Sequence, residues 1–167
     1  MRDSAALDIL KNAILLERRG KAFYTKVAEQ TESEAARRFF QMMADEEESH
    51  VRILSEQFKT YMESNKFASK KQSYTPSGSL SSKVLTEELK AQISAADFEA
   101  AAVAAAMYME KKAITLYAER SEAASDADEK ALYKWLADWE KTHLQFLSEV
   151  DRALTEEIWN DNNFWPL

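Results

Sequence analysis

The sequence predicts an all-α protein made of two helical hairpins. The 167 residues include only two glycines and two prolines, which leaves little material for turns. Apolar residues recur at helical spacing over long stretches, and the second half of the chain repeats the first half without a gap. The length suits one domain that spans residues 1–167.

The first hairpin is expected at about residues 4–63. Its first helix covers about residues 4–29, where Leu7, Leu10 and Ile14 begin an apolar stripe, and its second covers about residues 33–63. The intervening "TESE" has the form of a capping box. We therefore expect Thr31 and Glu34 to begin the second helix.

A crossover linker is expected at about residues 64–96, followed by the second hairpin at about 97–157. Residues 64–83 carry four lysines and no acidic residue, which favours a solvated loop over a basic patch for a partner or an anionic membrane. "TEELKAQI" is helical in pattern, as are residues 97–123 and 126–157, and "SDAD" provides a cap for the last helix. The tail at residues 158–167, "IWNDNNFWPL", is aromatic, so we expect it to fold over the bundle or to dock on a neighbour.

The two hairpins are copies of each other. A shift of 93 residues aligns Glu17 with Glu110, Glu47 with Glu140, and His50 with His143, the only two histidines. The same shift aligns Tyr24 with Tyr117. Each hairpin thus carries one isolated glutamate and one Glu-x-x-His pair, a combination far more specific than either pair alone.

The spacing places these six residues in one core. In each hairpin the isolated glutamate precedes the Glu-x-x-His glutamate by 30 residues, and the midpoints, Glu32 and Ser125, fall in the predicted turns. Residues equally far from a turn lie at the same height in an antiparallel helix pair. Glu17 therefore faces Glu47, Glu110 faces Glu140, and all of them lie on apolar helix faces.

Four buried carboxylates need compensating positive charge. Two divalent cations would balance them, and the two imidazoles would add neutral nitrogen ligands. This oxygen and nitrogen donor set suits iron or manganese better than calcium, with zinc as an alternative. Asp45, Glu46 and Glu48 are expected to be solvated instead, because the repeat aligns Glu46 with Trp139.

Composition excludes several other functions. Without cysteine the chain holds no disulfide, iron–sulfur cluster or thiol nucleophile. The net charge of −7 disfavours nucleic-acid binding, and no apolar run predicts a membrane span or secretory signal. We expect a cytoplasmic protein that binds neither nucleic acid nor membrane.

With "LLERRGKAFY", "ADEEESH", "MYMEKKAITLY" and "ADWEKTH", the sequence resembles the ferritin-like di-iron proteins, and among them the rubrerythrin di-iron domain, over about residues 5–155. The resemblance implies a ferritin-like four-helix bundle whose hairpins are joined by a long crossover. It implies two iron ions, with Fe–Mn or manganese as alternatives, and bridging roles for Glu47 and Glu140. The implied metal ligands are Glu17, Glu47, His50, Glu110, Glu140 and His143.

Two departures from rubrerythrins stand out. The rubredoxin-like module, with its cysteine pairs, has no counterpart in this chain. The additional glutamate that rubrerythrins carry three residues after the third-helix ligand is replaced by Ala113, whose repeat partner is Gly20. We hypothesise that these small residues open a pocket for oxygen or peroxide; close helix packing is the alternative.

The resemblance implies a non-haem di-iron peroxidase that reduces hydrogen peroxide with electrons from an external donor such as a rubredoxin-like protein. Tyr24 and Tyr117 are candidates to hydrogen-bond the ligand carboxylates and supply protons, with ordinary core packing as the alternative. We expect a homodimer. The alternative functions are a ferroxidase for iron storage or delivery, with oxygen as oxidant, and a helical binding or sensing module with structural metals.

Overall fold

Five helices form the described parts of the chain. The computed structural model describes residues 4–69, 82–94, 97–161 and 163–166. The helices are α1 (Ser4–Gln30), α2 (Glu34–Ser64), α3 (Ser82–Gln92), α4 (Phe98–Ala123) and α5 (Ala127–Trp159). None of the helices in these ranges is long and apolar enough to span a membrane. The expectation of a solvated loop at residues 64–83 falls largely on residues 70–81, which lie outside the described residues.

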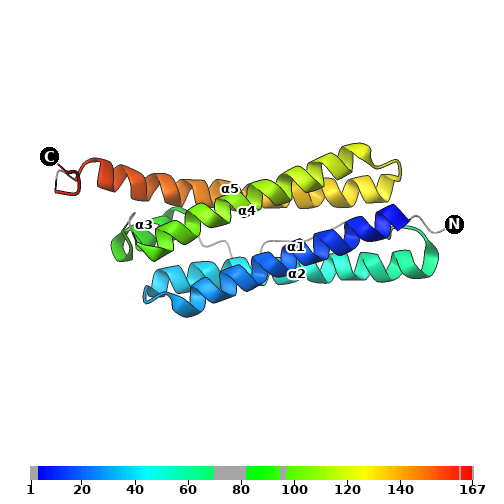
Figure 1. The fold of residues 1–167 in the computed structure, drawn as a ribbon, viewed down its shortest axis with the longest axis horizontal. Helices are drawn as coiled ribbons and strands as arrows, with labels where there is room; N and C mark the ends of the chain where they lie inside the picture. Colours follow the sequence, from blue (N-terminus) through cyan, green and yellow to red (C-terminus); the bar gives the residue numbers. More distant parts are fainter. Residues whose placement is uncertain (1–3, 70–81, 95–96, 162, 167) are drawn as a thin grey trace.

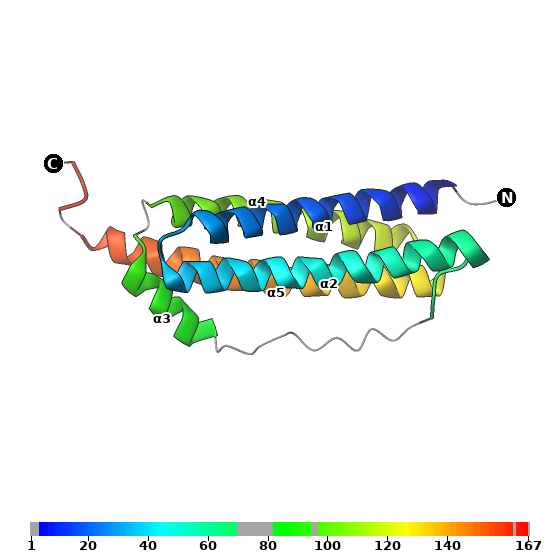
Figure 2. The same cartoon turned by 90° about the horizontal axis from the view of Figure 1, so that it is seen from below.

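The four long helices form the predicted bundle (Figure 1). α1 packs along α2, and α4 packs along α5, so each predicted hairpin is a closely packed pair. Figure 2 shows α1 beside α4 on one side of the bundle and α2 beside α5 on the other. Each helix therefore lies next to its repeat partner, and an approximate twofold axis relates the two hairpins.

The short helix α3 closes one end of the bundle, where it contacts α2 and α5 (Figure 2). Its buried residue Leu89 and the following Ile93 join the core there. Gln92 also links α3 to the start of α2. Its side-chain oxygen accepts one hydrogen bond from the Ala35 backbone N–H and one from the Ser33 hydroxyl, each with a length of 3.0 Å. The "TEELKAQI" pattern thus forms a separate helix within the crossover.

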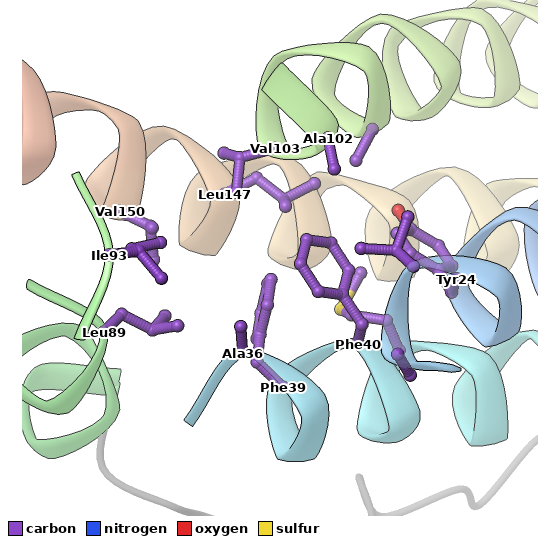
Figure 3. Packing of buried hydrophobic residues seen from close by; sticks show 14 of the residues in the cluster. Tyr24, Ala36, Phe39, Phe40, Leu89, Ile93, Ala102, Val103, Leu147 and Val150 are labelled. Carbon is purple, nitrogen blue, oxygen red and sulfur yellow. The ribbon is translucent and has the colours of Figure 1, made fainter. Parts of the chain in front are cut away.

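The apolar core has two parts, one toward each end of the bundle. Figure 3 shows the part nearer α3, where Phe39 and Phe40 of α2 point toward Leu147 of α5 and Val103 of α4. The other part includes Leu54, Tyr133 and other residues near the opposite end. Between these two apolar regions lies a belt of buried polar groups, which positions the candidate site near the middle of the bundle.

One predicted helix cap is wrong. The N-cap of α2 is Ser33, whose hydroxyl accepts a hydrogen bond of 3.1 Å from the Ala36 backbone N–H. Thr31 is buried and instead donates its hydroxyl to the Glu99 carboxylate of α4, while Glu34 pairs with Arg37. The capping box fails because Thr31 turns inward to bridge the hairpins. The cap predicted within "SDAD" is confirmed, and the structure identifies it as Asp126, whose carboxylate accepts a hydrogen bond of 2.8 Å from the Glu129 backbone N–H.

The C-terminal aromatic residues pack on one another. Trp165 makes edge contacts with both Trp159 and Phe164, and the three side chains remain 40% to 70% exposed. This segment lies beyond the end of the bundle (Figure 1). Of the two expectations for the tail, folding over the bundle is therefore not what the structure shows, and docking on a neighbour stays a prediction.

Candidate metal centre

Six buried side chains meet in the middle of the bundle. α1 contributes Glu17 and α4 contributes Glu110, while α2 and α5 each contribute the Glu and His of a Glu-x-x-His pair. No member is more than 6% exposed. The structure thus brings together all six predicted ligands: Glu17, Glu47, His50, Glu110, Glu140 and His143.

These residues divide into two overlapping groups of four. Glu17 and His50 belong to one group, Glu110 and His143 belong to the other, and Glu47 and Glu140 belong to both. Within each group the candidate ligand atoms lie within 4.8 Å of one another. This is the arrangement of two neighbouring cation sites that share two carboxylates.

Both histidines present Nδ1 to the carboxylates. His50 Nδ1 lies 3.1 Å from Glu17 Oε2 and 2.9 Å from Glu140 Oε1. His143 Nδ1 lies 2.9 Å from Glu140 Oε2 and 3.7 Å from Glu110 Oε1. Glu140 therefore extends one oxygen toward each histidine, as a carboxylate between two metal ions would.

The two predicted tyrosines cross between the hairpins. The hydroxyl of Tyr24 on α1 donates to Glu110 on α4, and the hydroxyl of Tyr117 on α4 donates to Glu17 on α1. Burial, followed by the nearby carboxylates, raises the pKa of each tyrosine well above its usual value. Both tyrosines therefore stay neutral and keep the proton that they donate.

The carboxylates respond to burial and to one another. Burial, reinforced by Glu17 and Glu140, raises the pKa of Glu47 well above its usual value. Burial and Glu140 raise the pKa of Glu110 to about 8. Without added positive charge, part of the cluster must therefore carry protons.

The pKa values of Glu140 and of the two histidines shift in opposite directions, and each shift favours the charged form. Burial opposes the charge on Glu140, but His50 and His143 outweigh it and hold the pKa of Glu140 well below its usual value. Burial likewise opposes charge on both histidines, but the carboxylates outweigh it and raise both imidazole pKa values. In the absence of metal, protons supply the positive charge that the cluster requires.

A small cavity adjoins the carboxylates. Its volume is about 20 Å³. Its lining consists of four pairs of repeat partners, which places it on the approximate twofold axis: Leu16 and Met109, Glu17 and Glu110, Gly20 and Ala113, Glu47 and Glu140. The space predicted beside Gly20 and Ala113 is therefore present.

Gly20 also allows a close helix contact. A Cβ atom at this position would lie 3.2 Å from Glu47 Cδ, tighter than ordinary van der Waals contact. The two sequence hypotheses for Gly20, a pocket and close packing, thus describe the same place. The absence of a side chain at Gly20 leaves room for the carboxylate of Glu47, which belongs to both groups.

One buried acid was assigned to the surface by the sequence. Glu46 is only 5% exposed, and its Oε2 lies 3.9 Å from His143 Nε2. The expectation that it is solvated is wrong, whereas Asp45 and Glu48 are exposed as predicted. The expectation was wrong because it relied on the repeat alignment of Glu46 with Trp139. The heptad spacing of Phe39, Met43, Glu46 and His50 along α2 would have revealed its buried position.

The donor set fits divalent transition metals. Carboxylate oxygens and imidazole nitrogens, without thiolates, suit iron, manganese or zinc. The six side chains are buried, and their candidate ligand atoms converge in two groups. Because an uncompensated cluster of buried carboxylates is costly, bound cations account for this arrangement better than packing does.

Comparison with protein families supports the same assignment. The rubrerythrin family profile matches residues 8–150. The chain belongs to the rubrerythrin family. No curated protein and no solved structure gave a match to the chain.

Family membership and the buried cluster agree. The rubrerythrin match includes all six residues of the cluster, and it implies iron binding at a ferritin-like di-iron site. As in the ferritin-like di-iron carboxylate proteins, a glutamate from each of two helices and Glu-x-x-His from the other two project inward. The cluster is therefore a candidate metal centre in a ferritin-like fold.

Proposed function

We propose that this rubrerythrin-family protein is a non-haem di-iron oxidoreductase that reduces hydrogen peroxide to water. The observation that carries the proposal is the pair of four-residue groups that share Glu47 and Glu140 beside a small cavity. Glu17 and His50 would complete one iron site, and Glu110 and His143 the other. Manganese in one or both sites is the alternative occupancy, because the same donors bind it.

The reaction consumes one peroxide, two electrons and two protons, and it yields two water molecules. A pair of ferrous ions, when bound, supplies the two electrons. The protein holds a proton close to the site on Tyr24, whose pKa burial raises well above its usual value and whose hydroxyl donates to Glu110 at the cavity wall. Tyr117 orients Glu17 in the same way from the other hairpin.

The size of the cavity favours a small oxidant. Its volume of about 20 Å³ is slightly above the roughly 10–15 Å³ that one water molecule needs. Peroxide and oxygen, with two heavy atoms, are of this scale, whereas an organic substrate would have to displace Leu16 or Met109. The cavity therefore supports a peroxidase over an oxygenase that acts on organic molecules.

The electrons would come from a separate donor protein, such as one of the rubredoxin type. The chain has no cysteine and so provides no thiolate-bound iron of its own. The proposed donor would restore the ferrous pair after each turnover.

Stopped-flow mixing tests the proposal. The anaerobic protein loaded with two ferrous ions is mixed with peroxide in one experiment and with oxygen in another. We expect oxidation to be faster with peroxide. Equal or slower oxidation with peroxide would contradict the preference, and assembly into a 24-subunit cage on a sizing column would favour the ferroxidase and storage function.

A further inference from the structure

The two histidines of the centre have different surroundings, although the repeat makes them equivalent. Glu46 of α2 approaches His143 of the other hairpin. The repeat partner of Glu46 is Trp139, whose ring lies 6.0 Å from the ring of His50, edge to face. An acid therefore stands beside one imidazole where an indole stands beside the other.

The outer nitrogens of the two imidazoles differ in the same way. His50 Nε2 is buried, and no described residue forms a hydrogen bond with it. His143 Nε2 accepts a hydrogen bond from the Trp139 indole N–H over a distance of 3.2 Å, and Glu46 Oε2 lies 3.9 Å from the same nitrogen. Among the described residues, a carboxylate lies near this nitrogen in His143 and not in His50.

Metal binding through Nδ1 is strengthened by an acceptor at Nε2. Nδ1 of His143 faces the carboxylates, so a metal bound there leaves the ring proton on Nε2. The Trp139 indole is a donor only and cannot accept that proton. Glu46 Oε2 is buried and has no hydrogen-bond partner in the described chain, and it lies 3.9 Å from His143 Nε2.

We propose that Glu46 is a positioning residue that accepts a hydrogen bond from His143 Nε2–H and makes the His143 side of the centre the tighter metal site. This inference rests on the proposed metal function. A carboxylate behind a ligating histidine fixes the orientation of the ring and makes it a stronger ligand. The His50 side, with indole edges in place of the acid, lacks this support.

Titration with Mn²⁺, which stays divalent in air, tests the difference in affinity. We expect the parent to bind two ions with unequal affinity. Glu46→Ala should weaken the tighter site by about 10- to 100-fold, the usual cost of losing such a partner, and bring the two affinities together. Glu46→Gln, which keeps a side-chain oxygen as acceptor, should retain most of the difference.

Glu48→Ala is the matched control, because Glu48 lies on the same helix but is exposed and pairs with Lys21. It should leave both affinities unchanged. A second readout is the imidazole ¹H–¹⁵N NMR spectrum of the Zn²⁺-loaded protein. We expect a protected, hydrogen-bonded Nε2–H signal from His143 in the parent and its loss in Glu46→Ala.

The outcomes separate the two proposals. If Glu46→Ala binds two ions with the affinities of the parent and keeps the protected Nε2–H signal, the role of Glu46 is overturned while the metal centre stands. If Glu46→Gln loses as much affinity as Glu46→Ala, the role as a hydrogen-bond acceptor is overturned. If the parent binds no Mn²⁺, Zn²⁺ or Fe²⁺, the proposed metal centre itself fails.

Discussion

Glu47 and Glu140 are the two residues on which both halves of the centre depend. Each belongs to both ligand groups, and each is almost wholly buried. Their environments nonetheless differ, since the pKa of Glu47 is raised while that of Glu140 is lowered. The difference arises because Glu140 has a histidine on either side, whereas Glu47 faces Glu17 and Glu140.

Gly20 is the residue that sets the space around Glu47. Gly20→Ala places a Cβ atom 3.2 Å from Glu47 Cδ, so the carboxylate must shift by a few tenths of an ångström. Better helix propensity offsets this contact by up to about 1 kcal/mol, so the metal-free protein should change little in stability. We expect metal affinity to fall by about tenfold, because the displaced carboxylate belongs to both ligand groups.

Isothermal titration with Mn²⁺ and thermal melts of the metal-free protein check this prediction. Arg19→Ala is the control, because Arg19 is the exposed neighbour on the same helix. Unchanged metal affinity in Gly20→Ala would show that the close contact with Glu47 has no bearing on the centre.

The helices depend on local signals at their ends as well as on the core. The α4–α5 turn is fixed by Asp126, whose carboxylate caps the Glu129 backbone N–H. Glu129 in turn holds Arg120 of α4 through a salt bridge of 2.5 Å. The turn therefore joins the two helices of the second hairpin at the end away from α3.

Asp126→Ala should destabilise the protein by about 1 kcal/mol, because the first turn of α5 loses its side-chain acceptor. For a chain of this size the melting temperature should fall by about 2–4 °C per kcal/mol. Circular dichroism melts of the variant check this value, with Ser125→Ala, an exposed turn residue, as the control. Equal melting temperatures for Asp126→Ala and the parent would contradict the capping role.

Apolar periodicity and the internal repeat are the two sequence signals that predict the arrangement of the helices. The four long helices follow from apolar spacing, and the alignment of the two Glu-x-x-His pairs predicts which residues converge. The heptad spacing along α2 can predict that Glu46 is buried, but not that it approaches His143. The contact of Thr31 with Glu99 could not be predicted from either pattern. Glu46 and Thr31 both turn toward the opposite hairpin, and only packing between the hairpins decides that choice.

The whole molecule couples folding, protons and metal. Glu110, with a folded-state pKa of about 8, holds a proton in the metal-free folded protein that the unfolded chain releases near pH 4.5. Burial also raises the pKa of Glu47 above its usual value. Because the folded state binds more protons between these values, the stability that they contribute is complete below about pH 4.5 and is lost as pH rises toward 8.

The metal-free protein should therefore melt at a lower temperature at about pH 8 than at about pH 6. Bound metal replaces these protons, so its stabilising effect should grow over the same interval. Melts of the chelator-treated and Mn²⁺-loaded protein at both pH values check this. A metal-free melting temperature that rises from the lower to the higher pH would contradict the proton-bearing cluster.

The central claim is that the bundle holds two metal ions that share Glu47 and Glu140. The most direct measurement is the metal content of protein purified without added metal, compared for the parent, Glu47→Ala, Glu140→Ala and the exposed control Glu48→Ala. We predict about two iron or manganese ions per chain in the parent and the control, and the loss of both ions in the two other variants. A parent that contains no metal and binds no ferrous ion anaerobically, or full metal content in Glu47→Ala and Glu140→Ala, would contradict the claim.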